Sequence, residues 1–310
     1  MKTLEALHDE ELPKRVPIAE SDHTQLGPGR PELRTSVGLN LGELVVARMR
    51  FEPRFIGRTV PVEGWVSFLL PLGFTGQYLF NGKALEPFCV GLSTRAEGYV
   101  TRGENVEIVG AGLRLSNLKR DLAALSGREP DELALCNGPL RLSGPDFASL
   151  RHRLLQASHA PHDTDREQLM GEALYADILM ALHCTLPKLG KTDRDDKDCL
   201  IVRRAEECFM ASYPRQPALV ELCRAAGVGK NRLYAAFRLL FDETPVNYFH
   251  RRRFSATHCS LSRLNPERGL VKQVALKNGF SELGRFSVEY RRLFGESPSS
   301  TLAREPIGPS

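Results

Sequence analysis

Two short segments in the last third of the chain carry side chains that can read the edges of nucleobases. Asparagine can pair in a bidentate way with adenine, arginine can do the same with guanine, glutamate can accept a bond from cytosine, and small apolar groups can touch the methyl group of thymine. For each such residue, a solvated surface position is the alternative. The candidates for base contacts are Lys230, Asn231, Tyr234, Ala235, Glu282, Leu283, Gly284, Arg285 and Val288.

An internal repeat indicates which elements position these side chains. The first copy, LVELCRAAGVGKNRLYAAFRLLFDETP, covers Leu219–Pro245, and the second, LVKQVALKNGFSELGRFSVEYRRLFGESP, covers Leu270–Pro298. Each copy predicts a short apolar helix, a glycine (Gly227 or Gly279), a second helix and the ending Phe-x-x-[Ser/Thr]-Pro. Because glycine tolerates the left-handed backbone of a tight turn, this order is typical of a helix-turn-helix unit.

Apolar side chains spaced four residues apart orient the second helix of each copy. Leu233 with Phe237, and Phe286 with Tyr290, share one face of their helix and should anchor it to a core. The candidates for base contacts then fall on the outward face. A helical bundle with glycine turns is the alternative for a single copy, but two copies that agree at several positions favour tandem helix-turn-helix units.

The second copy resembles a known family closely. The segment VALKNGFSELGRFSVEYRRLFGESPSS, Val274–Ser300, is similar to the second helix-turn-helix unit of the AraC/XylS family of bacterial transcription regulators, and the resemblance extends over residues 196–303. It implies a sequence-specific regulator of transcription, an activator that contacts RNA polymerase once bound to double-stranded DNA. Two positions depart from the family pattern: Asp242 stands where glycine is usual, and Thr257 stands where alanine is usual.

A connecting helix is predicted between the two units, over Pro245–Leu264. A rigid connector would let one chain place two helices in successive major grooves, about 34 Å apart. The segment His250–Arg253 adds a dense cationic patch to it. Contacts from arginine to phosphate position a protein on DNA and make binding depend on salt. The arginines expected to make them are Arg224, Arg238, Arg251, Arg252, Arg291 and Arg292.

Residues 37–190 predict a β-rich region followed by helices. Glu43–Phe51 alternates between apolar and polar residues, and glycine turns punctuate further short runs. The resemblance implies a cupin-like barrel that binds a small-molecule effector, forms a homodimer, or both. A helix expected over 166–186 carries a broad apolar stripe, which suits either a dimer surface or packing on the sheet. The residues expected in an effector pocket, with core packing as the alternative for the aromatics, are Arg48, Phe68, Tyr78 and Phe80.

These patterns predict an α+β protein with an all-α C-terminal domain. We expect a flexible segment over 1–36, a sensor or dimerisation domain over 37–190, a linker over 191–198, a DNA-binding domain over 199–303 and a disordered tail over 304–310.

The charge distribution agrees with a polyanion partner for the C-terminal part. The net charge of the 310 residues is +4, but residues 199–310 hold 18 Lys and Arg against 10 Asp and Glu. No apolar run approaches the roughly 18 residues of a membrane helix, and the N-terminus lacks the apolar stretch of a signal peptide. We therefore expect a cytoplasmic protein with no membrane partner.

Residues that could support catalysis or bind a metal are sparse. The seven cysteines form no C-x-x-C pair, and His159-x-x-His162-Asp163 is the one spacing that suggests a metal site, in an expected loop. We expect neither enzyme activity nor a cofactor or metal. One alternative is a DNA alkyl-transfer repair protein, which would need a reactive cysteine such as Cys89 or Cys136. The other is an adaptor whose helical repeat no longer binds DNA.

Overall fold

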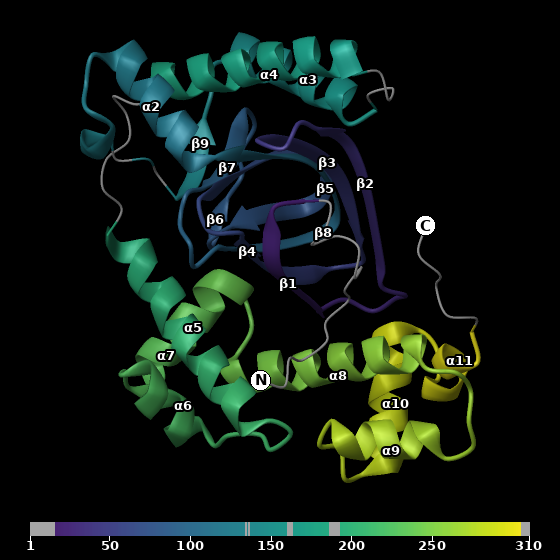
Figure 1. The fold of residues 1–310 in the computed structure, drawn as a ribbon. Coiled ribbons are helices and arrows are strands. Elements are labelled where there is room, and N and C mark those ends of the chain that lie inside the picture. Colours follow the sequence, from purple (N-terminus) through teal and green to yellow (C-terminus); the bar gives the residue numbers. More distant parts are fainter. Residues whose placement is uncertain (1–15, 134, 136, 160–163, 186–192, 305–310) are drawn as a thin grey trace.

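A strongly curled antiparallel sheet forms the first half of the molecule. The computed structural model describes residues 16–304 apart from 134, 136, 160–163 and 186–192. Figure 1 shows the sheet between a layer of helices above it and a second helical region below it. Its strands are β1 (Ile18–Gln25), β2 (Glu32–Asn40), β3 (Leu44–Glu52), β4 (Phe55–Pro61), β5 (Trp65–Phe80), β6 (Lys83–Ala84), β7 (Cys89–Ser93), β8 (Tyr99–Arg114) and β9 (Gly138–Arg141).

The long strand β8 organises the sheet. It pairs with β5 along one edge, while its other edge pairs with β4 near its start and with β3 near its end. The order β1-β4-β8-β5-β7-β9 results, with β2 joined through β3. A β-rich N-terminal half and a helical C-terminal half confirm the predicted α+β class.

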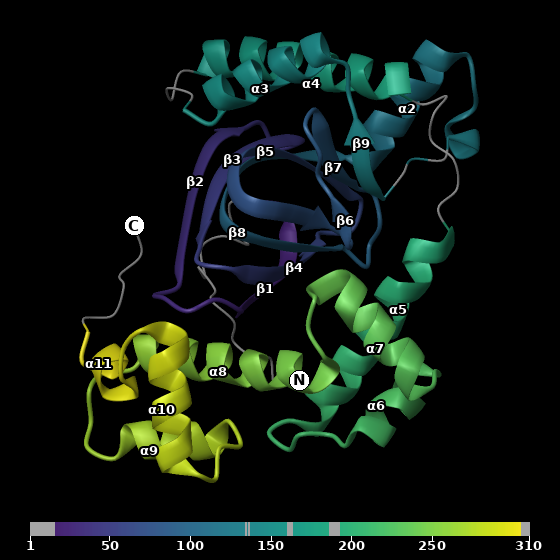
Figure 2. The ribbon, with the colours of Figure 1, turned by 180° about the vertical axis from the view of Figure 1, so that it is seen from behind.

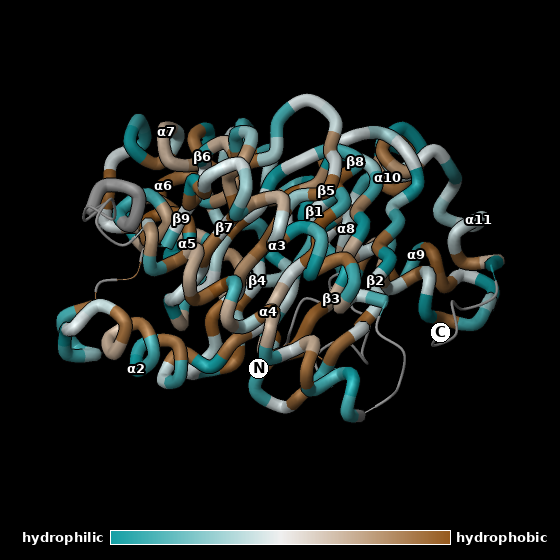
Figure 3. Tube along the Cα trace, turned by 90° about the horizontal axis from the view of Figure 1, so that it is seen from above, coloured by the Kyte–Doolittle hydropathy of each residue, from teal (hydrophilic) through white to brown (hydrophobic). Residues whose placement is uncertain are grey.

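Buried cores lie on both faces of the sheet, and the successive side chains of a strand alternate between them. Phe68 packs in a core that includes the helical layer, whereas its neighbour Leu69 packs with Tyr78 and Phe80 on the other face. The layer consists of α2 (Leu115–Ser126), α3 (Gly144–Ala157) and α4 (Thr164–Thr185). From above, hydrophobic and hydrophilic stretches alternate along α2 (Figure 3), as expected for a helix with one buried face.

The sheet extends further toward the N-terminus than the sequence predicts. Residues 1–36 were expected to be flexible, but β1 pairs with β4 and β2 pairs with β3. Prolines interrupt the local pattern there, and the stabilising partners lie elsewhere in the chain. Residues 1–15 lie outside the described part.

The predicted linker and tail are also partly wrong. Helix α5 (Asp193–Ser212) begins inside the expected linker 191–198, and Asp198 is buried beside Arg232. At the other end, Arg304 pairs with Glu296, so the expected disordered tail does not begin there. Residues 191–192 and 305–310 lie outside the described residues.

The C-terminal region contains two small helical units joined by one long helix. Viewed from behind (Figure 2), α8 (Pro245–Arg263) runs from one group of helices to the other. Its first half supplies Tyr248 and Phe249 to the core of the first unit, and its second half supplies Phe254 and Leu261 to the core of the second. The remaining helices are α6 (Leu219–Ala226), α7 (Lys230–Phe241), α9 (Leu270–Lys277), α10 (Leu283–Phe294) and α11 (Pro298–Leu302).

Within the described part of the chain, none of the helices has both the length and the apolar character of a membrane span.

Candidate nucleic-acid interface

The two glycine turns have the backbone that the repeat predicts. Gly227 caps α6 with φ +68°, and Gly279 follows α9 with φ +77°. The second turn is also crowded, because a Cβ at Gly279 would lie 2.4 Å from the carbonyl oxygen of Pro214. One turn therefore joins α6 to α7 and the other joins α9 to α10, each in a helix-turn-helix arrangement.

Anchor side chains hold α7 and α10 in their units as predicted. Leu233 and Phe237 are 0% exposed, and Phe286 and Tyr290 are 2% and 0% exposed. The buried face of each helix is thereby defined, so the opposite face is left for solvent or a ligand.

The candidates for base contacts lie on those opposite faces. Tyr234 and Leu283 are half-buried, and the other candidates are exposed: Lys230, Asn231, Ala235, Glu282, Gly284, Arg285 and Val288. Val288 is 70% exposed although it is apolar. Contact of these residues with DNA stays a prediction.

Neighbouring groups already hold two of these side chains. The ammonium group of Lys230 lies 5.7 Å from the ring centre of Tyr234. The Arg285 Nε donates to Glu289 Oε1 at 2.7 Å, and this hydrogen bond and the carboxylate charge raise the pKa of Arg285. Base recognition by Arg285 would thus exchange an exposed ion pair for a guanine.

Four of the six predicted phosphate contacts are sterically available. Arg224, Arg238, Arg291 and Arg292 are exposed on or beside the two units. Their charges can face a polyanion without being desolvated first.

The prediction for Arg252 is wrong. Its side chain is 5% exposed and lies between Asp22 of β1 and Glu206 of α5, with an Nη1–Oε1 distance of 2.7 Å to Glu206. Tyr248 donates to the same carboxylate at 2.5 Å, and Arg58 of β4 lies 3.8 Å from its other oxygen. Burial lowers the pKa of Arg252, but attraction to Asp22, Tyr248 and Glu206 outweighs it and raises the pKa overall.

The expected cationic patch on α8 also faces inward in part. Arg251 donates to the carbonyl oxygen of Leu26 at 2.5 Å and lies 3.4 Å from Glu243. Arg253 is buried and donates to the carbonyl oxygen of Asn278 at 2.9 Å, next to the second turn. Arg251 and Arg253 thus make contacts within the protein that stabilise the fold. The sequence of α8 does not reveal this, because most of their partners lie far away in the chain.

The predicted effector pocket is not assembled as expected. Only Tyr78 borders the cavity inside the sheet, while Phe68 and Phe80 are 0% exposed core residues outside its lining. The guanidinium of Arg48 pairs with Glu107, with an Nε–Oε1 distance of 2.7 Å. Core packing, the alternative reading of the aromatics, therefore applies to Phe68 and Phe80.

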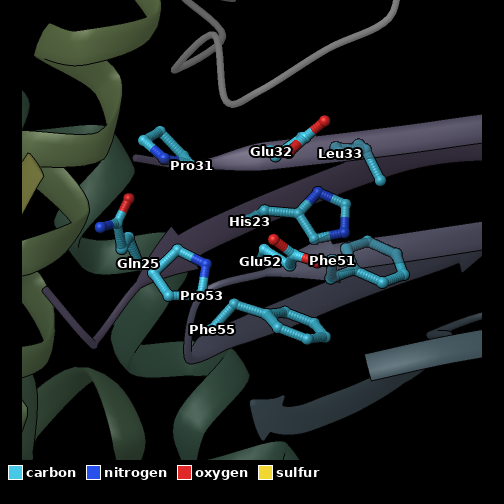
Figure 4. A pocket seen from close by; sticks show the side chains of 9 residues that line it. All are labelled: His23, Gln25, Pro31, Glu32, Leu33, Phe51, Glu52, Pro53 and Phe55. Carbon is cyan, nitrogen blue, oxygen red and sulfur yellow. The ribbon is translucent and has the colours of Figure 1, made fainter. Parts of the chain in front are cut away.

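Two adjoining cavities do lie at the mouth and in the interior of the curled sheet. The outer cavity lies between β1, β2, β3 and β4, with Gln25 at the end nearest the helices (Figure 4). The inner one reaches Tyr78 and Tyr99, and burial raises the pKa of Tyr99 to about 12. Each cavity has room for about one water molecule.

Comparison with known proteins agrees with the geometry of the C-terminal domain. Residues 222–304 match a family model described as a helix-turn-helix domain. "XylDLEGF operon transcriptional activator 2" of Pseudomonas putida is 36% identical over 100 residues, which cover 32% of this chain and 64% of that protein. The C-terminal domain is therefore similar to the helix-turn-helix domain of AraC/XylS-type transcription activators.

A second relative matches over a similar length of this chain. "Probable thc operon regulatory protein" of Rhodococcus erythropolis is 32% identical over 108 residues, 34% of this chain and 32% of that protein. The chain thus spans less than two thirds of the length of these relatives.

Two solved structures are similar at lower levels. "AraC-like transcriptional activator CuxR" aligns over 75% of this chain and 84% of its own, with 13% identity and a TM-score of 0.39. ToxT from Vibrio cholerae aligns over 91% and 97%, with 11% identity and a TM-score of 0.28.

Of the residues singled out for catalysis or metal binding, Cys89 and His159 lie in the described part of the chain. Cys89 is buried, and burial raises the pKa of its thiol, which is the opposite of what a reactive cysteine needs. No cluster of three metal-ligating side chains occurs among the residues described. Cys136, His162 and Asp163 lie outside them.

Sequence reasoning missed the residues that join the sheet to the helical units. Asp22 and Gln25 of β1 contact residues of α8 and α10, and Arg54 and Arg102 contact Asp242, which follows α7. No periodicity or motif marks these four residues, since each partner is more than 100 positions away in the sequence.

Proposed function

We propose that the protein is a sequence-specific DNA-binding regulator of transcription. The exposed faces of α7 and α10 that carry the candidates for base contacts, here called the reading faces, would enter adjacent major grooves. The exposed arginines beside them would bind the phosphates. The N-terminal sheet would act on the DNA-binding units through the contacts that it makes with them.

The observation that carries this proposal is the shared helix α8. Tyr248 and Phe249 belong to one core, and Phe254 and Leu261 belong to the other, so both units pack on the same helix. A bundle without DNA function would not need two matched helix-turn-helix units whose outward faces are both exposed.

The test is a selection of fragments from the source genome on the full-length protein, followed by footprinting and titration at several salt concentrations. We expect one common site with protection in two adjacent major grooves. The logarithm of affinity should fall with the logarithm of salt with a slope of about −0.9 for each phosphate neutralised. Weak binding that is indifferent to sequence would contradict the proposal.

A matched pair of variants separates base reading from general affinity for polyanions. Asn231→Ala and Arg285→Ala each remove a predicted base contact, and each lost contact should cost about 1–3 kcal/mol on the selected site. Arg291→Ala should instead weaken binding to selected and unrelated DNA to a similar degree.

We propose activation as the direction of control, because the P. putida relatives are named operon activators. A promoter fusion to a reporter in cells with and without the chain tests this, and a fall in expression would identify a repressor instead. Contact with RNA polymerase, a small-molecule effector and homodimerisation stay predictions of the family resemblance.

A further inference from the structure

The N-terminal sheet contacts the C-terminal ends of α7 and α10, the recognition helices of the proposed regulator. The side-chain amide of Gln25 donates to the carbonyl oxygen of Leu293 at 2.9 Å, and the backbone amide of Gly29 donates to the same oxygen at 3.0 Å. At the other unit, a Cβ added to Gly82 would lie 3.1 Å from the carbonyl oxygen of Leu239. Leu239 and Leu293 belong to the last turns of α7 and α10.

The residues that end the two recognition helices occupy matching positions in the repeat. Gly295 ends α10 with φ +73°, and an added Cβ there would lie 4.0 Å from the Cα of Gly29. Asp242 ends α7 with φ +56°, a conformation that suits glycine better than aspartate. The C-terminal ends of both helices therefore face the sheet. Asp242 at the end of α7 carries a side chain, whereas Gly295 at the end of α10 does not.

Two arginines pair with this aspartate: Arg54, between β3 and β4, and Arg102 of β8. The carboxylate of Asp242 lies 3.2 Å from an Nη of Arg54 and 3.0 Å from an Nη of Arg102. The Arg102 side chain is only 13% exposed, and burial lowers its pKa while attraction to Asp242 opposes that shift. The charge of Arg102 is thus partly desolvated and depends on this partner.

Strand β1 also lies along α8, the helix that joins the two units. The backbone amide of Gln25 donates to Ser255 Oγ at 3.0 Å, near the middle of α8. Arg251 and Arg252 of α8 reach Leu26 and Asp22 on the same segment. The sheet is consequently fixed to the first unit, to the connector and to the second unit.

These contacts leave the reading faces open. Asn231, Ala235, Arg285 and Val288 are exposed even though the sheet packs against the other ends of their helices. The sheet thus contacts the C-terminal ends of the two helices and leaves their reading faces accessible.

We propose that the N-terminal sheet sets the angle between the two recognition helices and thereby selects the spacing of the two half-sites on DNA. Asp242, with Arg54 and Arg102, and Gln25 are the positioning residues. This inference rests on the proposed function, because spacing has meaning only for a protein that reads two grooves.

The spacing preference of the full-length protein tests the inference. Binding is measured on the selected site and on sites with one base pair inserted or removed between the half-sites, which rotates one half-site by about 34° relative to the other. The readout is the ratio of the affinities. A general gain in affinity from removing a negative charge cancels in that ratio.

Asp242→Gly is the key variant, because glycine suits the left-handed backbone and should leave α7 intact. We expect it to reduce the spacing ratio by about threefold or more, as for coupled contacts in one network. Arg54→Gln with Arg102→Gln should give the same reduction. Adding Asp242→Gly to that pair should reduce the ratio no further.

An unchanged ratio in Asp242→Gly and in the arginine pair, with a clear spacing preference in the wild-type protein, would overturn the inference and leave the proposed function standing. Absence of specific DNA binding by the wild-type protein would overturn both. Gln25→Leu provides an independent arm at the second unit. It removes the donor to Leu293 and should also relax the spacing preference.

Discussion

Replacement of Arg252 by methionine distinguishes a structural arginine from a DNA-binding one. Methionine keeps an unbranched apolar side chain and removes the guanidinium charge, which leaves Glu206 buried at 3% exposure without its closest cation. Breaking a buried ion pair in this way costs about 3–5 kcal/mol. The lower end applies, because Tyr248 still donates to Glu206 and Arg58 lies 3.8 Å away. We therefore expect Arg252→Met to lose about 3 kcal/mol of unfolding free energy.

Urea unfolding of the full-length protein, followed by circular dichroism, measures this loss as a lower midpoint at constant slope. The matched control is Arg224→Met, which removes an exposed arginine and should change stability by no more than about 0.5 kcal/mol. The double variant with Glu206→Gln should recover part of the loss, because the amide leaves no unpaired charge and can still accept from Tyr248.

The opposite pattern would refute the reasoning. If Arg252→Met unfolds at the wild-type midpoint but loses about one unit of the salt slope, as a phosphate contact does, then Arg252 binds DNA and the buried network is of no consequence.

Three further changes have defined outcomes. Gly227→Ala should cost about 1 kcal/mol through its positive φ alone. Gly279→Ala should cost more, since its Cβ would lie 2.4 Å from the Pro214 carbonyl oxygen, and thermal unfolding compares the two variants. Burial lowers the pKa of His258 to about 4, so the unfolded chain binds the proton first as pH falls below about 6.5. The melting temperature should therefore drop between about pH 6.5 and about pH 4. Arg285→Ala should relax base preference at one position of the selected site, measured by binding to singly substituted sites.

Each of these has an outcome that contradicts it. Equal costs for the two glycine variants would show that the Pro214 contact yields without strain. His258→Phe should lack the acid-dependent drop, and a drop identical to wild type would assign it to other groups. Unchanged base preference in Arg285→Ala would mean that Glu289 keeps this arginine in the complex.

The parts of the structure that local patterns determine agree with the sequence-based predictions. The repeat located both helix-turn-helix units, their glycine turns and the buried anchors Leu233, Phe237, Phe286 and Tyr290. This succeeds because the period of a helix fixes which side chains share a face, and because a left-handed turn restricts the residue type wherever it occurs.

Features that depend on distant pairing needed the tertiary structure. Strand β1 has a weak local pattern and is stabilised by β4 and by α8, so it was mistaken for a flexible segment. The cavity lining was likewise misjudged, because one step along a strand moves a side chain from one face of the sheet to the other, and each face carries a buried core.

Charged residues show the division most clearly. The sequence by itself determined that the C-terminal part is basic and that several arginines lie on one helix, but Arg251 and Arg252 look the same there as Arg224 or Arg291. Only the folded chain brings Asp22 and Glu206 to Arg252, and Arg54 and Arg102 to Asp242. Whether a charge meets solvent, DNA or a buried partner depends on its distance from groups that are remote in sequence, and that distance exists only after folding.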